Sequence, residues 1–323
     1  MRPRRGAVRV ALCGGVLAGA TLAGSAVGAS GAAAARPVTS ITLGVSAGNG
    51  PGNADLALAL GYFRSAGLDV TIKPLTGAGA EAIAGLDSGS LTIVESNVVS
   101  VIQGAAHGIA APCFAGGVDF RNNLGADVLE ASKPITKPQQ LAGKSIGVIS
   151  TNSFNTLEID AYLAAHGVDY RSVHYVATGV TNTLAALKAG SVQAAELVAP
   201  FSLEYLKSGG HVMVDDFQSY LHTPLFACWT GLHSWVGSHT AVVKAFDAAL
   251  ARADTYYYAH PAAAAKLIAK EDGLPPVANL PADAFTYTTA ISAAQVQQLI
   301  TLSNRYGVVT GNVKLGAVYQ PVG

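Results

Sequence analysis

The sequence GLDSGSLTIVE at residues 85–95 has a counterpart, ALKAGSVQAAE, at residues 186–196, 101 residues later. In each, a helical run ends near a glycine, and a short strand-like run ending in glutamate follows. The segments 66–70 (AGLDV) and 166–170 (HGVDY) repeat at an offset of 100 residues. Self-similarity at a fixed spacing indicates a duplicated structural unit. We therefore expect two lobes of related βαβ topology.

Short β-rich runs alternate with helical runs in both copies of this repeat. That alternation is typical of an α/β protein whose parallel-rich sheets carry helices on both faces. The expected strands are 40–46, 69–75, 91–95, 109–116, 144–150, 173–177 and 193–198, and the expected helices are 54–66, 78–87, 98–106, 156–165 and 181–188.

The segment 118–141 is predicted to cross from the first lobe to the second. It has few apolar residues and contains Pro134 and Pro138, and proline is excluded from helix interiors and central strands. The segment 224–236 (PLFACWTGLHSWV) is predicted to be a strand run that returns to the first lobe, where the helical segments 240–258, 261–271 and 292–306 pack. The expected organisation is an export signal over 1–35, lobe 1 over 36–118 and 224–323, and lobe 2 over 119–223.

Residues 1–35 have the features of a cleaved export signal. Arg2, Arg4, Arg5 and Arg9 precede an apolar run, and small alanines end the segment. General secretory and twin-arginine export both remain open. Removing this leader takes away four of the 20 basic residues and none of the 20 acidic ones, so the remaining chain has a formal net charge of −4. After the leader, the sequence has no run of about 18 apolar residues that would predict a membrane-spanning helix. We therefore expect a periplasmic or secreted protein.

Composition and motifs exclude several classes of protein. Charged residues make up 12% of the chain and are balanced in sign, which excludes a basic nucleic-acid binder. The GVSAG motif at 44–48 resembles a nucleophile elbow, but too little mature chain precedes it to build an oxyanion hole. The eight histidines form no closely spaced pair, so we expect no metal and no cofactor.

Cys113 and Cys228 remain after the leader is removed, and both lie in strand-like runs. An oxidising compartment permits a bridge between them. Two buried free thiols are equally compatible with the sequence, so both alternatives stay open.

Polar, glycine-rich loops follow the predicted strands of both lobes. In open α/β sheets, ligands bind outside the carboxyl ends of the strands, where helix N-termini present free N–H groups. The same Asn, Ser and Thr residues also cap helices, so each has a structural alternative. As a group, they predict a ligand site between the lobes.

The chain resembles the solute-binding proteins of ABC importers of the nitrate, sulfonate, taurine and thiamine-precursor type. The resemblance covers roughly 40–270 and is carried by the segments 54–70 (ADLALALGYFRSAGLDV), 85–96, 139–150 (QQLAGKSIGVIS), 161–169 and 185–197. It implies a two-lobed type II periplasmic-binding-protein fold, with two hinge strands and a small solute trapped between the lobes. It also implies a monomer that docks on an ABC permease and has no catalytic activity.

The matching loops imply a set of ligand-binding residues. The first lobe contributes residues before its first helix and after its third strand, the second lobe contributes three loops, and the return strand adds an aromatic wall. These residues are Asn49, Asn53, Glu95, Ser96, Asn97, Asn152, Ser153, Phe154, Thr178, Gly179, Pro200 and Trp229.

The predicted loops contain no obvious Arg or Lys, and Glu95 lies near the expected cleft. The solute is therefore predicted to be either sulfonate-like, held by helix dipoles, or a neutral or cationic pyrimidine-like ring. Two other functions remain as alternatives. One is an enzyme of thiamine-pyrimidine synthesis on the same fold, which would show a Cys/His cluster and no export signal. The other is a ligand-sensing module of a signalling system.

Overall fold

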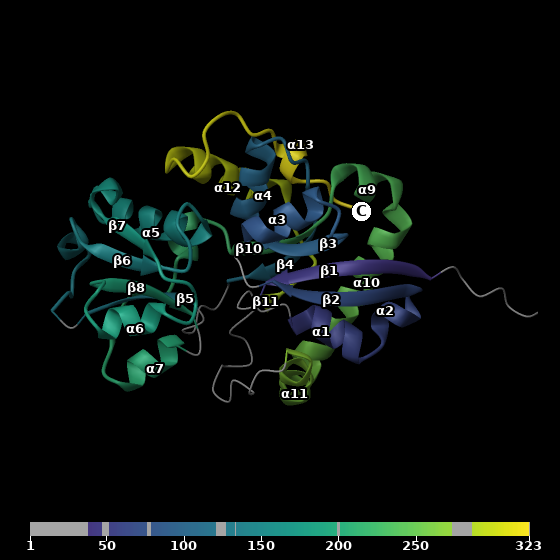
Figure 1. The fold of residues 1–323 in the computed structure, drawn as a ribbon, viewed down its shortest axis with the longest axis horizontal. Helices are drawn as coiled ribbons and strands as arrows, with labels where there is room; N and C mark the ends of the chain where they lie inside the picture. Colours follow the sequence, from purple (N-terminus) through teal and green to yellow (C-terminus); the bar gives the residue numbers. More distant parts are fainter. Residues whose placement is uncertain are drawn as a thin grey trace, which may run out of the picture. The chain divides into compact units, whose positions relative to one another are not determined.

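Two β-sheets organise the chain in the computed structural model (Figure 1). The structure describes residues 38–46, 52–75, 79–120, 127–132, 134–198, 201–272 and 286–322. The first sheet has the order β11-β4-β10-β3-β1-β2, and the second has the order β7-β6-β8-β5-β9. The strands of the first sheet are β1 (Thr39–Ser46), β2 (Leu68–Leu75), β3 (Ile93–Asn97), β4 (Cys113–Asp119), β10 (Leu225–Thr230) and β11 (Thr286–Tyr287). Those of the second are β5 (Asp127–Ala131), β6 (Ser145–Val148), β7 (His174–Ala177), β8 (Ala194–Val198) and β9 (His211–Val214).

The two sheets have the same topology over five strands. In the first, β1 pairs in parallel with β2 and β3, while β10 pairs antiparallel with β3 and β4. In the second, β6 pairs in parallel with β7 and β8, while β5 pairs antiparallel with β8 and β9. The predicted duplication is therefore present in the fold. Both sheets are mixed, with β10 and β11 antiparallel in the first and β5 antiparallel in the second. The remaining described strands of each sheet run in one direction, so the expectation of parallel-rich sheets is confirmed.

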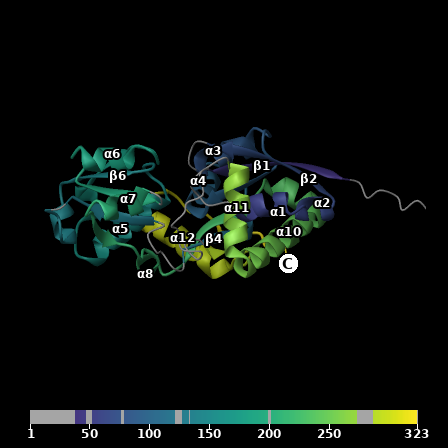
Figure 2. The same cartoon turned by 90° about the horizontal axis from the view of Figure 1, so that it is seen from below.

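Helices cover both faces of each sheet. Beside the first sheet lie α1 (Gly52–Ala59), α2 (Tyr62–Ser65), α3 (Gly79–Asp87), α4 (Val98–Ala106), α9 (His233–Ser238), α10 (Thr240–Ala259), α11 (Pro261–Asp272), α12 (Ala293–Arg305) and α13 (Leu315–Val318). Helix α1 packs beside α10 and α11 (Figure 2). Beside the second sheet lie η1 (Pro138–Leu141), α5 (Phe154–Ala165), η2 (Tyr170–Ser172), α6 (Thr183–Lys188), α7 (Phe201–Lys207) and α8 (Gln218–Leu221).

The repeated turns have the same backbone conformation in both copies. Gly67 and Gly167, which match in the repeat, have φ values of 80° and 72°. Gly89 and Gly190 also match, with φ values of 72° and 74°. Glycine adopts this left-handed conformation without the steric cost that other residues pay, so the repeat conserves the turns as well as the strands.

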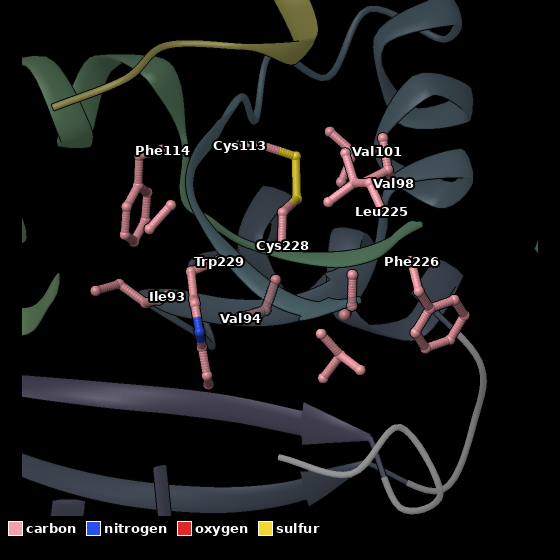
Figure 3. Packing of buried hydrophobic residues seen from close by; sticks show 14 of the residues in the cluster. Ile93, Val94, Val98, Val101, Cys113, Phe114, Leu225, Phe226, Cys228 and Trp229 are labelled. Carbon is pink, nitrogen blue, oxygen red and sulfur yellow. A yellow bond between two sulfur atoms is a disulfide. The ribbon is translucent and has the colours of Figure 1, made fainter. Parts of the chain in front are cut away.

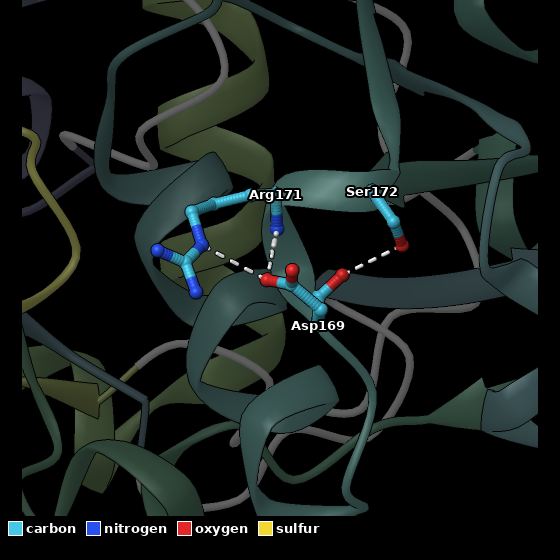
Figure 4. Close-up of polar contacts among 3 residues, drawn as sticks. All are labelled: Asp169, Arg171 and Ser172. Carbon is cyan, nitrogen blue, oxygen red and sulfur yellow. Dashed lines mark hydrogen bonds and ion pairs between the residues drawn. The ribbon is translucent and has the colours of Figure 1, made fainter.

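A polar corner fixes η2 before β7 (Figure 4). The Asp169 carboxylate accepts hydrogen bonds from the Arg171 backbone N–H at 3.2 Å and from its Nε at 3.0 Å. The Ser172 hydroxyl donates to the Asp169 carbonyl at 2.6 Å. These hydrogen bonds lower the pKa of Asp169. Asp169 and Arg171 are exposed, so their ion pair sets local geometry more than it adds stability.

A disulfide between Cys113 and Cys228 joins β4 to β10 inside the first core (Figure 3). Their Cα atoms are 5.6 Å apart, and both residues are completely buried. The two strands pair with several register shifts between them. The covalent bond therefore fixes an irregular part of the sheet, and of the two alternatives left by the sequence the structure has the bridge.

Two predicted segments differ from the structure. The segment 118–141 contains β5, which lies inside the second sheet between β8 and β9; Pro134 and Pro138 follow this strand and do not interrupt it. The segment 224–236 is a strand only over β10, and α9 begins at His233. The predicted leader lies outside the described residues.

Candidate functional site

Ser96 and Asn97 end β3, and α4 begins at the next residue. Both side chains are buried. The Asn97 Oδ1 atom accepts a 2.9 Å hydrogen bond from the Ser100 backbone N–H. This bond satisfies one of the N–H groups that the start of a helix leaves free. Asn97 therefore caps α4 at the end of a strand where a ligand site was predicted.

Glu95 lies in the middle of β3 and is fully buried. Burial and the neighbouring Tyr257 raise the pKa of Tyr287, and the carboxylates of Asp55 and Glu95 raise it further. The effect requires both carboxylates to lie near the Tyr287 hydroxyl, because charge interactions fall with distance. Glu95 thus shares a buried polar region with Tyr287 and Asp55.

Trp229 lies opposite Glu95 in the pairing of β10 with β3. Its side chain is completely buried, and its ring lies edge-on to Phe246 at a centroid distance of 5.3 Å. The indole Nε1 has no hydrogen-bond partner among the described residues. Figure 3 shows Trp229 in the core beside Ile93. The predicted aromatic wall is therefore core packing of the first sheet.

Asn53 lies in the first turn of α1 and is almost completely buried. Its amide donates a 3.0 Å hydrogen bond to the carboxylate of Asp254 on α10. Burial raises the pKa of Asp254 to about 7, although the Asn53 hydrogen bond opposes that rise. The Asn53 side chain therefore links α1 to α10 by a buried hydrogen bond.

The second sheet positions Asn152, Ser153 and Phe154 at the start of α5. Asn152 has a positive φ of 49°, and its carbonyl accepts a 2.5 Å hydrogen bond from Gln103 of α4. The Ser153 backbone N–H donates to the Thr156 hydroxyl at 3.0 Å, and the Ser153 hydroxyl donates to a carbonyl at 2.8 Å. This turn links the second sheet to α4 through Gln103.

Thr178 and Gly179 form the turn between β7 and α6. The Thr178 backbone N–H donates to the Val148 carbonyl at 2.9 Å, and its hydroxyl lies 2.7 Å from that of Thr183. Thr183 also donates to the Gly179 carbonyl at 2.7 Å. Gly179 has a φ of 71°, a conformation that favours glycine. The two remaining predicted residues, Asn49 and Pro200, lie outside the described residues.

Sequence reasoning missed the pair formed by Asn155 and Glu196. The Asn155 amide donates a hydrogen bond to the Glu196 carboxylate, which is completely buried at β8. The repeat carried the signal, because Glu196 is the counterpart of Glu95 and ends the second copy of the motif. Each sheet therefore has a buried glutamate in the middle of an equivalent parallel strand, β3 or β8.

Three phenylalanines bring the two sheets into contact. Phe120 follows β4, Phe226 lies on β10, and Phe154 begins α5. Phe120 stacks on Phe226 at a centroid distance of 4.4 Å, and Phe154 lies edge-on to Phe226 at 4.8 Å. All three are nearly buried. We call these three residues the Phe cluster; of them, Phe154 directly follows Asn152 and Ser153 in the chain.

The described linkers at these strand ends carry no positive charge. The segments 149–153 and 178–182 contain neither Lys nor Arg, and β3 runs straight into α4. Across the described ranges, no group of three or more His, Cys, Asp or Glu residues is arranged to hold a metal ion. None of the helices described here is long and apolar enough to cross a bilayer.

The fold matches solved bacterial binding proteins. The aliphatic sulphonate-binding protein SsuA of Escherichia coli superposes with a TM-score of 0.72 at 19% identity, over 87% of this chain and 92% of that chain. The alkanesulfonate-binding protein SsuA of Xanthomonas axonopodis pv. citri, bound to MOPS, gives 0.72 at 17% identity, over 88% and 98%. The nitrate-binding protein NrtA of Synechocystis PCC 6803 gives 0.70 at 12% identity, over 87% and 84%. The chain thus has the two-sheet periplasmic-binding-protein fold of type II.

The family follows from the sequence itself. A family model described as NMT1/THI5 like matches residues 55–264. The chain belongs to the NMT1/THI5-like family. No curated protein is significantly similar to it in sequence.

Proposed function

We propose that this chain is the extracytoplasmic solute receptor of an ABC importer. Its two sheets would form lobe 1 (36–118 and 224–323) and lobe 2 (119–223), with a small solute held between them. The observation that carries the proposal is the Phe cluster, where side chains from equivalent sheets meet beside polar strand-end turns. A solute that touches both sheets stabilises their closed arrangement, because only differential contacts shift a conformational equilibrium.

The proposed solute contacts are the polar groups at the strand ends of both sheets, together with the aromatic surface of Phe154. Asn53, Glu95 and Trp229 have interior partners or neighbours in the first sheet, and any effect of theirs on the solute would pass through the residues they support. The proposed contact residues are Asn49, Ser96, Asn97, Asn152, Ser153, Phe154, Thr178, Gly179 and Pro200.

The solute is either sulfonate-like or a pyrimidine-like ring, and two observations favour the ring. The Asn97 side chain already satisfies an N–H group at the start of α4, and the Ser153 N–H is bonded to Thr156. The described linkers also lack Lys and Arg. A strong anion would find few unused donors there, whereas an uncharged ring does not need them. Sulfonates are still included in the test below, because the structurally similar SsuA of Xanthomonas axonopodis pv. citri is bound to MOPS.

An enzyme on the same fold is the alternative that the family leaves open. Cys113 and Cys228, which remain after the predicted leader, are joined to each other. Neither thiol is therefore available as a metal ligand or nucleophile in this form, since both functions require a thiolate. This observation supports the receptor over an enzyme that depends on cysteine.

The test begins with the chain from Arg36 onward, purified without added ligand. Native mass spectrometry identifies any solute that remains bound, and a thermal-shift panel compares sulfonates, nitrate and aminopyrimidines. The receptor is supported if one compound raises the melting temperature in a saturable manner. If no member binds and no solute is retained, the receptor proposal is wrong.

A matched pair of variants then tests the site. Ser153→Ala removes a hydroxyl at the start of α5, and we expect the solute to bind more weakly by roughly three- to tenfold, the usual range for one hydrogen bond. Ser219→Ala makes the same change at an exposed position of α8 and should leave affinity unchanged. Equal affinity in both variants would remove Ser153 from the site.

A further inference from the structure

A pocket of about 280 Å³ opens on the second sheet, apart from the strand-end turns described above. It lies between the C-terminal end of α5, the strand β9, the helix α8 and the start of η1. Its lining residues are Thr136, Pro138, Tyr162, His166, His211, Val212, Met213 and Tyr220. Half of these residues carry an aromatic or imidazole ring.

The rings form a packed wall. Tyr162 is nearly buried, and its ring lies 4.5 Å from that of His166 and 5.3 Å from that of Tyr220, edge-on to the latter. His166 and Tyr220 are 5.6 Å apart. The Tyr162 hydroxyl donates to the Met213 carbonyl at 3.3 Å, which fixes the wall against β9. The ring positions are thus set before any ligand enters.

The polar atoms of the pocket have defined roles. The His166 Nδ1 atom lies 2.8 Å from the Tyr162 carbonyl oxygen. A carbonyl only accepts hydrogen bonds, so Nδ1 carries a proton, and in the tautomer protonated at Nδ1 the Nε2 atom is an acceptor. No described group bonds to the Tyr220 hydroxyl. A ligand that donates one hydrogen bond would therefore find an acceptor next to a ring surface.

We propose that this pocket binds an uncharged planar aromatic molecule of one or two fused rings that carries an N–H or O–H donor. The volume fits such a molecule, since an apolar cavity of about 150 Å³ holds one benzene ring. No lining residue has a permanent charge, and an ion placed there would lose hydration without gaining a counterion. Stacking and edge-on contacts with the tyrosine rings supply the binding surface, and Met213 adds an adaptable sulfur contact.

The proposal is tested with indole as the probe, titrated into the chain from Arg36 onward and followed by ligand-observed NMR. We expect saturable one-to-one binding with a dissociation constant below about 1 mM, in line with the efficiency of small fragments. Benzofuran has nearly the same shape and no N–H donor. It should bind roughly three- to tenfold more weakly, which corresponds to one hydrogen bond.

Three variants locate the binding. Thr136→Phe fills the pocket from an exposed rim position, so it should abolish indole binding without disturbing the core. Tyr220→Ala removes part of the wall and should weaken binding at least tenfold. Tyr170 is a half-buried tyrosine beside the same sheet that does not line the pocket. The control variant Tyr170→Ala should therefore bind indole as tightly as the unmodified chain does. Melting curves verify that each variant folds.

The outcomes separate clearly. Binding that is lost in Thr136→Phe and kept in Tyr170→Ala supports the pocket. No saturable binding by 1 mM, or binding that survives Thr136→Phe, overturns the proposal, because indole would then not occupy this space. Equal affinity for indole and benzofuran would refute the role of the N–H donor.

Discussion

The disulfide between Cys113 and Cys228 closes a loop that contains the whole second sheet. The two cysteines are 115 residues apart, and all strands from β5 to β9 lie between them. A crosslink stabilises the folded state mainly by reducing the entropy of the unfolded chain, by about 5 kcal/mol for a loop of this length. We expect the double variant Cys113→Ala/Cys228→Ala to lose stability of that order.

The loss translates into a measurable shift. Unfolding about 285 residues releases roughly 0.6 kcal/mol/K of entropy near the midpoint, so a loss of about 5 kcal/mol lowers the melting temperature by about 8 °C. Circular dichroism melting of the double variant and the unmodified chain measures this shift. Urea unfolding with and without reductant provides the control, because reductant should destabilise the unmodified chain and leave the variant unchanged.

A small effect would refute the reasoning. If the double variant melts within 2 °C of the unmodified chain, the loop does not restrict the unfolded state as argued. If reductant destabilises the double variant equally, the crosslink is not the source of the difference.

Three further predictions concern single residues. Burial raises the pKa of Glu130 from 4.5 to about 8, so between these pH values the folded chain keeps a proton that the unfolded chain releases. The free energy of unfolding therefore falls by up to about 1.4 kcal/mol per pH unit as the pH rises through this range. In urea unfolding, Glu130→Gln should make the free energy of unfolding depend less on pH between pH 5 and 8, and an unchanged slope would contradict this. Gly116→Ala should lower the free energy of unfolding by roughly 1–3 kcal/mol in the same assay, because the new Cβ would lie 2.5 Å from the Ala290 carbonyl oxygen. The control Gly237→Ala, whose Cβ would have no atom within 4 Å, should leave the free energy of unfolding unchanged. Asn97→Ala should cost about 1 kcal/mol through the lost cap of α4, and an unchanged unfolding midpoint would show that the cap adds no stability.

The repeat made the topology predictable. Its turns, strands and glutamates fall at equivalent places in the two sheets, because the pattern of glycine and alternating apolar residues records local structure directly. Strand β5 was harder to predict. Strand β5 is short and contains Asp127 and Glu130, and a charged residue in a central strand contradicts the usual pattern of burial.

The candidate site was predictable in position more than in detail. The strand ends and their polar turns follow from the fold. The partners of individual side chains depend on segments far away in the sequence, as with Asn53 and Asp254, which are 201 residues apart. Likewise, the burial of Trp229 against Phe246 depends on how α10 packs on the sheet, which local sequence does not encode.

The order of strands in the first sheet has a consequence for synthesis. Among the strands that the structure describes, β4 pairs with β10 and β11, and both come later in the chain. The second sheet, in contrast, is contiguous from β5 to β9. At about 5–20 residues per second, β4 waits several seconds or longer before β10 emerges from the ribosome. The chain therefore completes its inner segment first, and any factor that keeps the nascent protein from aggregating has to protect the edge of β4 in the meantime.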